Sequence, residues 1–168
     1  MSAFEQLIKE IALHLKDKHW SMVTAESCTG GLVASSLTEL PGSSAWFERG
    51  FVTYSNLAKQ EMLSVPLDLL KEYGAVSEPV AAAMALGALQ NSTGQVAVSI
   101  TGIAGPDGGS IEKPVGTVCF GWAMHGMNGA KTVRKQFSGN RQEIRLASCY
   151  EALSGVLSFI KNIPSNPR

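Results

Sequence analysis

Residues 20–37 read Trp-Ser-Met-Val-Thr-Ala-Glu-Ser-Cys-Thr-Gly-Gly-Leu-Val-Ala-Ser-Ser-Leu, a stretch that predicts a strand, a turn and a helix in succession. The strand is expected at 20–23, and the apolar end of the stretch is expected within the helix. Ser27, Cys28 and Thr29 then fall at the turn, where free backbone N–H groups and the positive end of a helix dipole favour ligand binding. The two glycines allow a ligand to approach the backbone closely.

Further elements are expected on both sides of this stretch, from the spacing of apolar residues and from turn signals. The sequence predicts helices at 4–18, 29–40, 56–63, 67–73, 77–90 and 141–161, and strands at 47–55, 95–100, 115–124 and 131–137. An Asn-Gly pair between the last two strands favours a hairpin. We therefore expect residues 1–168 to form a single three-layer α/β/α domain, a mixed sheet covered by helices. Its ordered core is expected at 4–160, and its tail at 164–168 is expected to be frayed.

Two local expectations concern the helices. Asn56 is expected to cap the helix that follows it, because an asparagine side chain can accept hydrogen bonds from the first free N–H groups. The small side chains at 81–86 suggest a helix that packs closely against a sheet or another subunit.

Composition limits the classes of function. The 168 residues carry 14 basic and 14 acidic side chains, and this balance speaks against nucleic-acid binding, which favours a basic excess. The apolar runs are too short to span a membrane, and the N-terminus lacks the pattern of a signal peptide.

Cys28, Cys119 and Cys149 are odd in number and widely spaced. They indicate reduced thiols in a cytoplasmic protein, the last two packed in the core.

Three polar loops punctuated by glycine, at 24–31, 41–44 and 101–110, suggest a ligand site, because such loops meet at strand ends in α/β sheets. Neither standard nucleotide-binding glycine motif is present. A phosphate could still bind the backbone from Gly102 to Gly109, with Arg141 as a cationic partner. Arg145 is also a candidate, but we expect it on a solvated face of its helix.

The choice of nucleophile lies between two neighbours, Ser27 and Cys28. A serine hydroxyl needs a base. The predicted positions of the three histidines, His14, His19 and His125, do not suit that role. A lysine can serve when burial lowers its pKa. Lys59 follows a polar segment at a predicted strand-to-helix turn. That segment includes Tyr54, which could orient the nucleophile or Lys59, or move the proton. From spacing alone, an exposed helix lysine is an equally good interpretation of Lys59.

Metal catalysis is not indicated. The sequence contains no H-x-x-x-H, no clustered cysteine and histidine, and no D-x-D. Glu26, Asp107 and Glu112 are separate acids, and Glu26 is expected to bond nearby N–H groups rather than a metal ion.

Six segments spread over most of the chain form a set of motifs. They are Thr-Ala-Glu-Ser-Cys-Thr-Gly-Gly at 24–31, Pro-Gly-Ser-Ser at 41–44, Gly-Phe-Val-Thr-Tyr-Ser-Asn at 50–56, Gly-Ala-Val-Ser-Glu-Pro at 74–79, Thr-Gly-Ile-Ala-Gly-Pro-Asp-Gly-Gly at 101–109 and Lys-Pro-Val-Gly-Thr-Val at 113–118. In this order they resemble the CinA C-terminal domain family. The resemblance covers residues 4–160 and is nearest to the stand-alone form of that family.

The resemblance implies hydrolysis of the carboxamide of nicotinamide mononucleotide to nicotinate mononucleotide and ammonia, in pyridine nucleotide salvage. It also implies a site without metal or cofactor, in a homo-oligomer. Carried over by position, it makes Ser27 the nucleophile, Lys59 its base and Tyr54 a helper. It makes three further residues contacts of the substrate or the transition state: Ser44, Thr101 and Arg141.

Three alternatives remain open at this point. Cys28 could replace Ser27 as the nucleophile, since a helix start can acidify a thiol. The domain could be a nucleotide-binding regulatory module without turnover. A DNA-binding role is the third alternative, and the zero net charge disfavours it.

Overall fold

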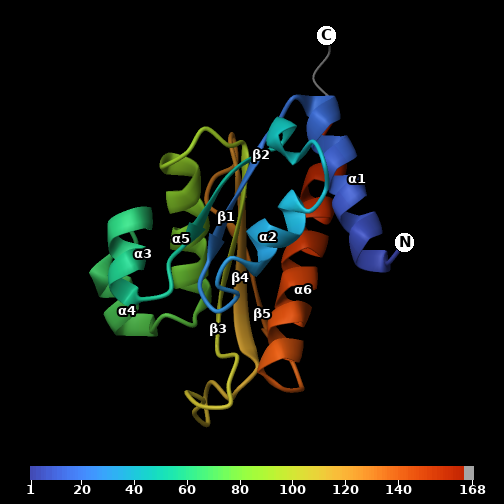
Figure 1. Ribbon diagram of the computed structural model, residues 1–168. Helices are drawn as coiled ribbons and strands as arrows, with labels where there is room; N and C mark the ends of the chain where they lie inside the picture. The colour runs from blue at the N-terminus through green and yellow to red at the C-terminus, as the bar shows by residue number, and fades with distance from the viewer. Residues whose placement is uncertain (165–168) are drawn as a thin grey trace.

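A five-stranded mixed sheet forms the middle layer of the protein in the computed structural model, which describes residues 1–164 (Figure 1). The strand order is β2-β1-β3-β4-β5. Strand β1 pairs parallel with β2 and β3, whereas β4 pairs antiparallel with β3 and β5. The strands are β1 (Met22–Glu26), β2 (Phe47–Val52), β3 (Val96–Gly102), β4 (Thr117–Met124) and β5 (Lys131–Gln136).

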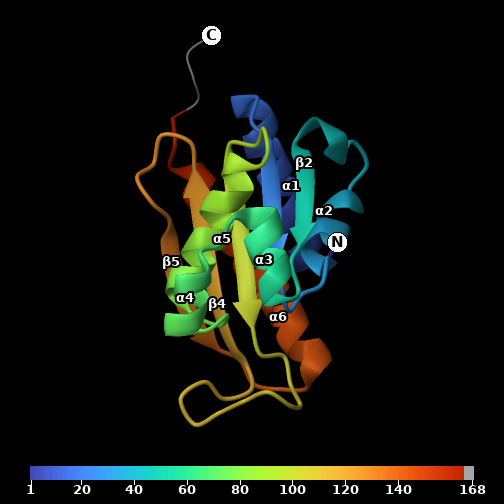
Figure 2. The same cartoon turned by 90° about the vertical axis from the view of Figure 1, so that its left-hand side faces the viewer.

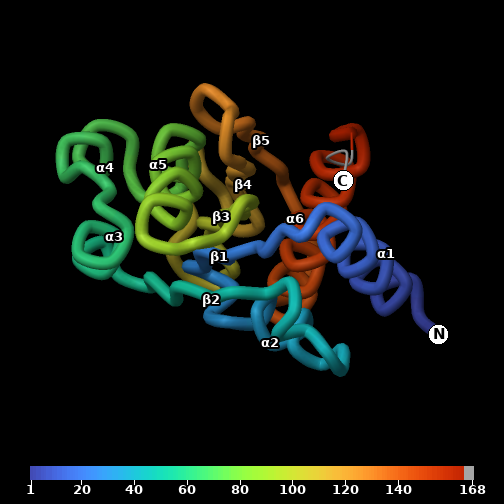
Figure 3. Tube along the Cα trace, turned by 90° about the horizontal axis from the view of Figure 1, so that it is seen from above, coloured from blue at the N-terminus to red at the C-terminus, as the bar shows by residue number. Residues whose placement is uncertain are grey.

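The helices form the two outer layers, as the view in Figure 3 shows. One layer contains α1 (Ala3–Lys18), α2 (Leu32–Thr38) and α6 (Arg141–Lys161). The opposite layer contains α3 (Asn56–Leu63), α4 (Leu67–Tyr73) and α5 (Glu78–Gln90). A short 3-10 helix, η1 (Ser43–Ala45), precedes β2. The predicted α/β fold with a mixed sheet covered by helices is confirmed.

The central strand β3 shows why each face of the sheet accepts its own layer. Val98 and Ile100 point into the core shared with α1 and α6, and Ala97 points into the core shared with α5. Alternate residues of a strand face opposite sides of a sheet, so one strand can present large side chains to one layer and small ones to the other. The large side chains fill the α6 side, and the small ones let α5 approach closely.

Glycines mark the closest approaches around α5. A Cβ atom on Gly87 would lie 1.9 Å from the Leu63 carbonyl oxygen, and one on Gly121 would lie 2.5 Å from the Ala81 carbonyl oxygen. Ser99 donates to that same Ala81 oxygen at 2.6 Å. The expected close packing of this small-residue helix is confirmed, with the sheet and α3 as its partners.

Element boundaries differ from the sequence prediction mainly around β1 and α2. Strand β1 continues to Glu26 because its last residues pair with both neighbouring strands, and α2 begins only at Leu32. Gly30 and Gly31 have φ angles of +58° and +99°, which delay the start of the helix. Ser55, rather than Asn56, caps α3 by accepting from the Ala58 N–H at 3.0 Å.

The other predicted helices and strands are found within a few residues of their expected bounds, including the hairpin of β4 and β5. From residue 165 on, the tail predicted to be frayed lies outside the described residues.

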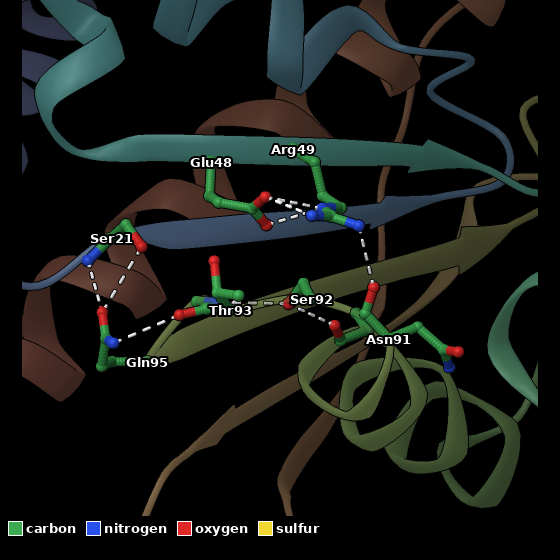
Figure 4. Close-up of polar contacts among 9 residues, drawn as sticks. Ser21, Glu48, Arg49, Asn91, Ser92, Thr93 and Gln95 are labelled. Carbon is green, nitrogen blue, oxygen red and sulfur yellow. Dashed lines mark hydrogen bonds and ion pairs between the residues drawn. The ribbon is translucent and has the colours of Figure 1, made fainter.

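Polar contacts tie together the amino ends of the parallel strands (Figure 4). The Ser21 N–H donates to Gln95 Oε1 at 2.7 Å, which joins the chain before β1 to the chain before β3. Arg49 of β2 donates to the Asn91 carbonyl oxygen at 3.1 Å and pairs with Glu48. These contacts lie at one end of the sheet and leave the carboxyl ends of the strands open for a site.

Glu26 ends β1 and stabilises the start of α2. Its fully buried carboxylate accepts from the N–H groups of Val33 at 2.9 Å and Ala34 at 3.0 Å. An anion at this position satisfies free donors of the first helical turn and opposes the positive end of the dipole. The expectation that Glu26 bonds N–H groups is confirmed.

We expect Glu26→Gln to lower the free energy of unfolding by about 1–3 kcal/mol, because one amide oxygen cannot replace a carboxylate that accepts two hydrogen bonds. Urea denaturation measures the change. Glu39→Gln, on an exposed residue at the end of α2, is the matched control and should change stability by less than about 0.5 kcal/mol. A Glu26→Gln protein as stable as the wild type would contradict this role.

Candidate active site

Loops from three parallel strands meet at the carboxyl end of the sheet. Glu26 at the end of β1 pairs in register with Val52 of β2 and Ile100 of β3, so the three strands end at nearly the same level. Ser27 follows β1 directly, Tyr54 follows β2, and Thr101 lies at the end of β3. This is the edge at which open α/β sheets bind ligands. Figure 2 shows the long loop after β3 extending from the same edge.

Ser27 and Lys59 are in direct contact. Lys59 lies on α3, and its Nζ is 3.0 Å from Ser27 Oγ. The lysine is only 1 % exposed although its helix lies at the edge of the molecule. Its Nζ also lies 3.0 Å from the Thr53 carbonyl oxygen and 3.4 Å from that of Tyr54. The chain turn after β2 therefore wraps around the amine and directs it at the serine.

The amine of Lys59 has no acidic partner. No ion pair among residues 1–164 involves Lys59, and burial lowers its pKa. A neutral amine has two N–H donors and one lone pair. Once the amine has lost its proton, the two carbonyl oxygens can accept both remaining N–H bonds, and the lone pair is left for the Ser27 hydroxyl. The surroundings thus favour the basic form of the lysine.

Cys28 is buried beside Ser27, at 5 % exposure. Burial raises the pKa of its thiol to about 11, so the group stays protonated near neutral pH. The geometry and the electrostatics both favour Ser27 over Cys28 as the reactive group. Cys119 and Cys149 are buried free thiols in the core, as expected.

Tyr54 and Arg141 meet at the rim of the site. Arg141, the first residue of α6, donates to the Tyr54 hydroxyl oxygen at 3.1 Å and to the Gly105 carbonyl oxygen at 2.8 Å. The Tyr54 side chain is 60 % exposed, so it lies within reach of an entering ligand. One guanidinium group therefore joins the loop after β2 to the loop after β3.

A pocket of about 270 Å³ collects most of the expected site residues. Its lining includes Ser27, Tyr54, Lys59, Thr101, Gly102 and Arg141. Thr101 donates its hydroxyl proton to the Ala75 carbonyl oxygen at 2.8 Å, so that proton is already engaged. Two polar residues that were not predicted to belong to the site, Asn56 and Asp107, also line the pocket.

Ser44 is not brought to this pocket. It is exposed in η1, which precedes β2. Because β2 runs parallel to β1, a residue before β2 lies near the amino ends of the strands, whereas Ser27 lies past a carboxyl end. Within one chain, Ser44 and Ser27 are at opposite ends of the sheet.

One expectation about the helix beside the loop after β1 is wrong. Arg145 is not on a solvated face: it is half-buried and donates to the carbonyl oxygens of Cys28 at 3.2 Å and Thr29 at 3.0 Å. It lies four residues after Arg141, so both arginines share one side of α6, and this i, i+4 spacing was the available signal. In the first turn of α2, Glu26 binds the N–H groups of Val33 and Ala34, whereas the Cys28 N–H in the turn before the helix makes no hydrogen bond to another described residue.

Other candidate sites lack comparable chemistry. Within residues 1–164, no group of three His, Cys, Asp or Glu side chains gathers where it could hold a metal ion. A larger hollow, about 520 Å³, lies between α1 and α2, but its lining contains no nucleophile paired with a base. The three histidines all lie outside the pocket at Ser27. No helix in the described part of the chain has the length and apolar character needed to cross a lipid bilayer.

Comparisons with known proteins agree with the fold and with the motifs. Residues 4–160 match the model of the CinA C-terminal domain. The chain is 55% identical over 159 residues to the nicotinamide-nucleotide amidohydrolase PncC of Enterobacter agglomerans, covering 94% of this chain and 96% of the relative. It is 53% identical over 162 residues to the protein of the same name from Escherichia coli K12, with 96% and 98% covered.

One solved structure has a closely similar fold. The crystal structure of the competence/damage inducible protein CihA from Agrobacterium tumefaciens superposes with a TM-score of 0.92 at 43% sequence identity. The match covers 96% of this chain and 98% of that one. On these matches, the chain belongs to the CinA C-terminal domain family.

Proposed function

We propose that this protein is an amidohydrolase that converts nicotinamide mononucleotide and water to nicotinate mononucleotide and ammonia. The observation that carries the proposal is the buried Lys59 amine, 3.0 Å from Ser27 Oγ and without an acidic partner in the described part of the chain. The names of the two relatives that are more than half identical support the choice of substrate. The reaction would serve pyridine nucleotide salvage.

In the proposed mechanism, Ser27 Oγ attacks the carboxamide carbon while neutral Lys59 takes the hydroxyl proton. The resulting tetrahedral intermediate collapses, its C–N bond breaks, and the nitrogen leaves as ammonia after it receives a proton from Lys59 or through Tyr54. Water then attacks the acyl-serine ester, and Lys59 takes the proton of that water and returns it to Ser27 Oγ as the ester C–O bond breaks. The sum consumes one water and forms one carboxylate and one ammonium ion, because the ammonia takes up the proton of the acid.

Remote contacts would position the amide for this attack. Arg141 and most of the segment from Gly102 to Gly108 line the same pocket. We propose that Arg141 and the backbone from Gly102 to Gly109 hold the 5′-phosphate. Thr101 and Gly102 would contact the substrate near the reacting group. Binding energy from such a distant group can be used to orient the reacting atoms.

We further propose that the protein acts in the cytoplasm as a homo-oligomer, as the family resemblance implies. Ser44 lies at the far end of the sheet from the pocket of its own chain. A substrate contact by Ser44 would therefore require the pocket of another copy.

The purified protein should release ammonia from nicotinamide mononucleotide, and Ser27→Ala should reduce kcat by roughly 10³-fold or more, because the nucleophile is lost. Cys28→Ala is the matched neighbour and should keep kcat within about tenfold of the wild type, since its thiol is protonated and takes no part in the chemistry. Coupled ammonia detection measures both variants.

The reverse pattern, with full activity in Ser27→Ala and none in Cys28→Ala, would move the nucleophile to Cys28. Binding of nicotinamide mononucleotide by the wild type without any ammonia would support the regulatory module instead.

Lys59→Met should abolish measurable turnover while the fold remains intact, because Ser27 then has no base in contact with it. Ammonia release and circular dichroism provide the two measurements. Lys71→Met removes an exposed lysine of α4 and should leave kcat unchanged. Turnover near the wild-type rate in Lys59→Met would exclude the Ser–Lys mechanism.

Both kcat and the stability gained from Lys59 should depend on pH in a defined direction. Burial lowers the pKa of Lys59, and only the neutral amine acts as a base, so kcat should rise with pH through that lowered pKa and be lost below it. The unfolded chain binds the proton more tightly than the folded one. The stability of the wild type relative to Lys59→Met should therefore also rise with pH, between the lowered pKa and the ordinary value for lysine.

Rate and urea-unfolding profiles from about pH 6 to about pH 10 check both slopes. A kcat that falls as pH rises across this range would contradict a lysine base.

A further inference from the structure

Arg145 holds the loop that carries the nucleophile without lining the pocket. Its Nε and one terminal nitrogen donate to two consecutive carbonyl oxygens, those of Cys28 at 3.2 Å and Thr29 at 3.0 Å. Gly30 follows with φ +58°, and a Cβ atom there would lie 3.5 Å from the guanidinium group. The glycine therefore gives the backbone the conformation that this contact needs, and a Cβ atom at that distance would make only an ordinary van der Waals contact.

The contact is the first of a chain of hydrogen bonds that leads back to the nucleophile. Arg145 binds the carbonyl oxygen of Thr29, and the N–H of the same peptide unit belongs to Gly30. That Gly30 N–H donates to the Ser27 carbonyl oxygen at 3.0 Å. The N–H of this second peptide unit belongs to Cys28, the residue immediately after the nucleophile. Two peptide units thus connect the guanidinium charge to the Cys28 N–H.

The Cys28 N–H is the last donor of this chain. A trans peptide directs its N–H and its C=O to opposite sides, so this N–H points away from Gly30. Within residues 1–164 it makes no hydrogen bond to another residue, whereas the Ser27 N–H is used by the Ile100 carbonyl oxygen at 2.9 Å. Cys28 also lines the pocket. Hydrogen bonds in series polarise one another, so a cation at one end strengthens the donor at the other.

We infer that Arg145 is a positioning residue for the amidohydrolase reaction: through the peptide units after Ser27, it orients and polarises the Cys28 N–H as a donor to the oxyanion of the tetrahedral intermediate. This inference rests on the proposed function. The helix-start N–H groups of Val33 and Ala34 are occupied by Glu26, so the donor nearest in sequence to the nucleophile remains for the task. An oxyanion donor acts on the transition state more than on the bound substrate.

The two arginines of α6 should therefore have different kinetic effects. Loss of one oxyanion donor costs about 10²–10³-fold in kcat in well-studied hydrolases. We expect Arg145→Ala to lower kcat by roughly 10- to 100-fold, because the donor is misaligned rather than removed, with KM within about threefold of the wild type. Arg141→Ala, which removes a pocket-lining cation, should mainly raise KM.

A conservative substitution and a chemical rescue distinguish a positioning role of Arg145 from a general structural role. Arg145→Lys keeps a charge but lacks the planar fork that binds the two carbonyls, so its kcat should fall between those of the wild type and Arg145→Ala. Added guanidinium chloride at low concentration should restore part of the kcat of Arg145→Ala. Arg49→Ala is the matched control, because Arg49 also donates to a main-chain carbonyl, at the opposite end of the sheet, and its loss should leave kcat unchanged (Figure 4).

Amide hydrogen exchange supplies a measurement that needs no turnover. In Arg145→Ala, exchange should accelerate in residues 27–31 while the strands keep wild-type protection. Unchanged kcat together with unchanged exchange in a folded Arg145→Ala protein would overturn the inference, as would a loss confined to KM. A wild-type protein that releases no ammonia would instead defeat the proposed function, and the exchange result would still decide whether Arg145 holds the loop.

Discussion

The contact between Lys59 and Ser27 depends on an amine that is kept in the interior without a counter-ion. Moving a charged ammonium group out of water is costly, so an unpaired buried lysine favours its neutral form. A nearby carboxylate would reverse this preference by stabilising the proton. The acid directly before Ser27 is Glu26, and its carboxylate is occupied by two N–H groups of α2. The site therefore requires the Glu26 carboxylate to point away from Lys59, although Glu26 directly precedes Ser27 in the sequence.

Strand alternation provides that separation. Successive residues of a strand face opposite sides of the sheet, so Glu26 points toward the layer of α2 while Ser27, just past the strand end, points toward the layer of α3. The parallel pairing of β1 with β2 and β3 adds the second condition, because it brings the loops after all three strands to one edge. A shift of β1 by one residue in its register would exchange the directions of the acid and the nucleophile.

The sequence allowed most of the architecture to be predicted, because amphipathic helices and turn residues leave strong local signals. The motif after β1 pointed to Ser27, and elimination of the histidines pointed to Lys59. The sequence carries no comparable signal for contacts between segments that meet only in the folded chain. Arg145 has the sequence context of an ordinary surface arginine, and only the placement of α6 beside the loop shows its two carbonyl partners. Ser44 lies in a promising glycine motif, but the direction of β2 places it at the wrong end of the sheet for its own pocket.

The loop after β1 is thus held from both sides by charge, although it contains no charged residue itself. Glu26 binds N–H groups where the loop enters α2, and Arg145 binds carbonyl oxygens nearer the nucleophile. Each ion matches the polarity of the backbone groups it meets, so each stabilises the loop without needing the other as a partner. A direct ion pair between them would satisfy both charges and release the backbone. Their separation explains how one short segment can be rigid, carry a neutral nucleophile and still keep the Cys28 N–H from being used by another described residue.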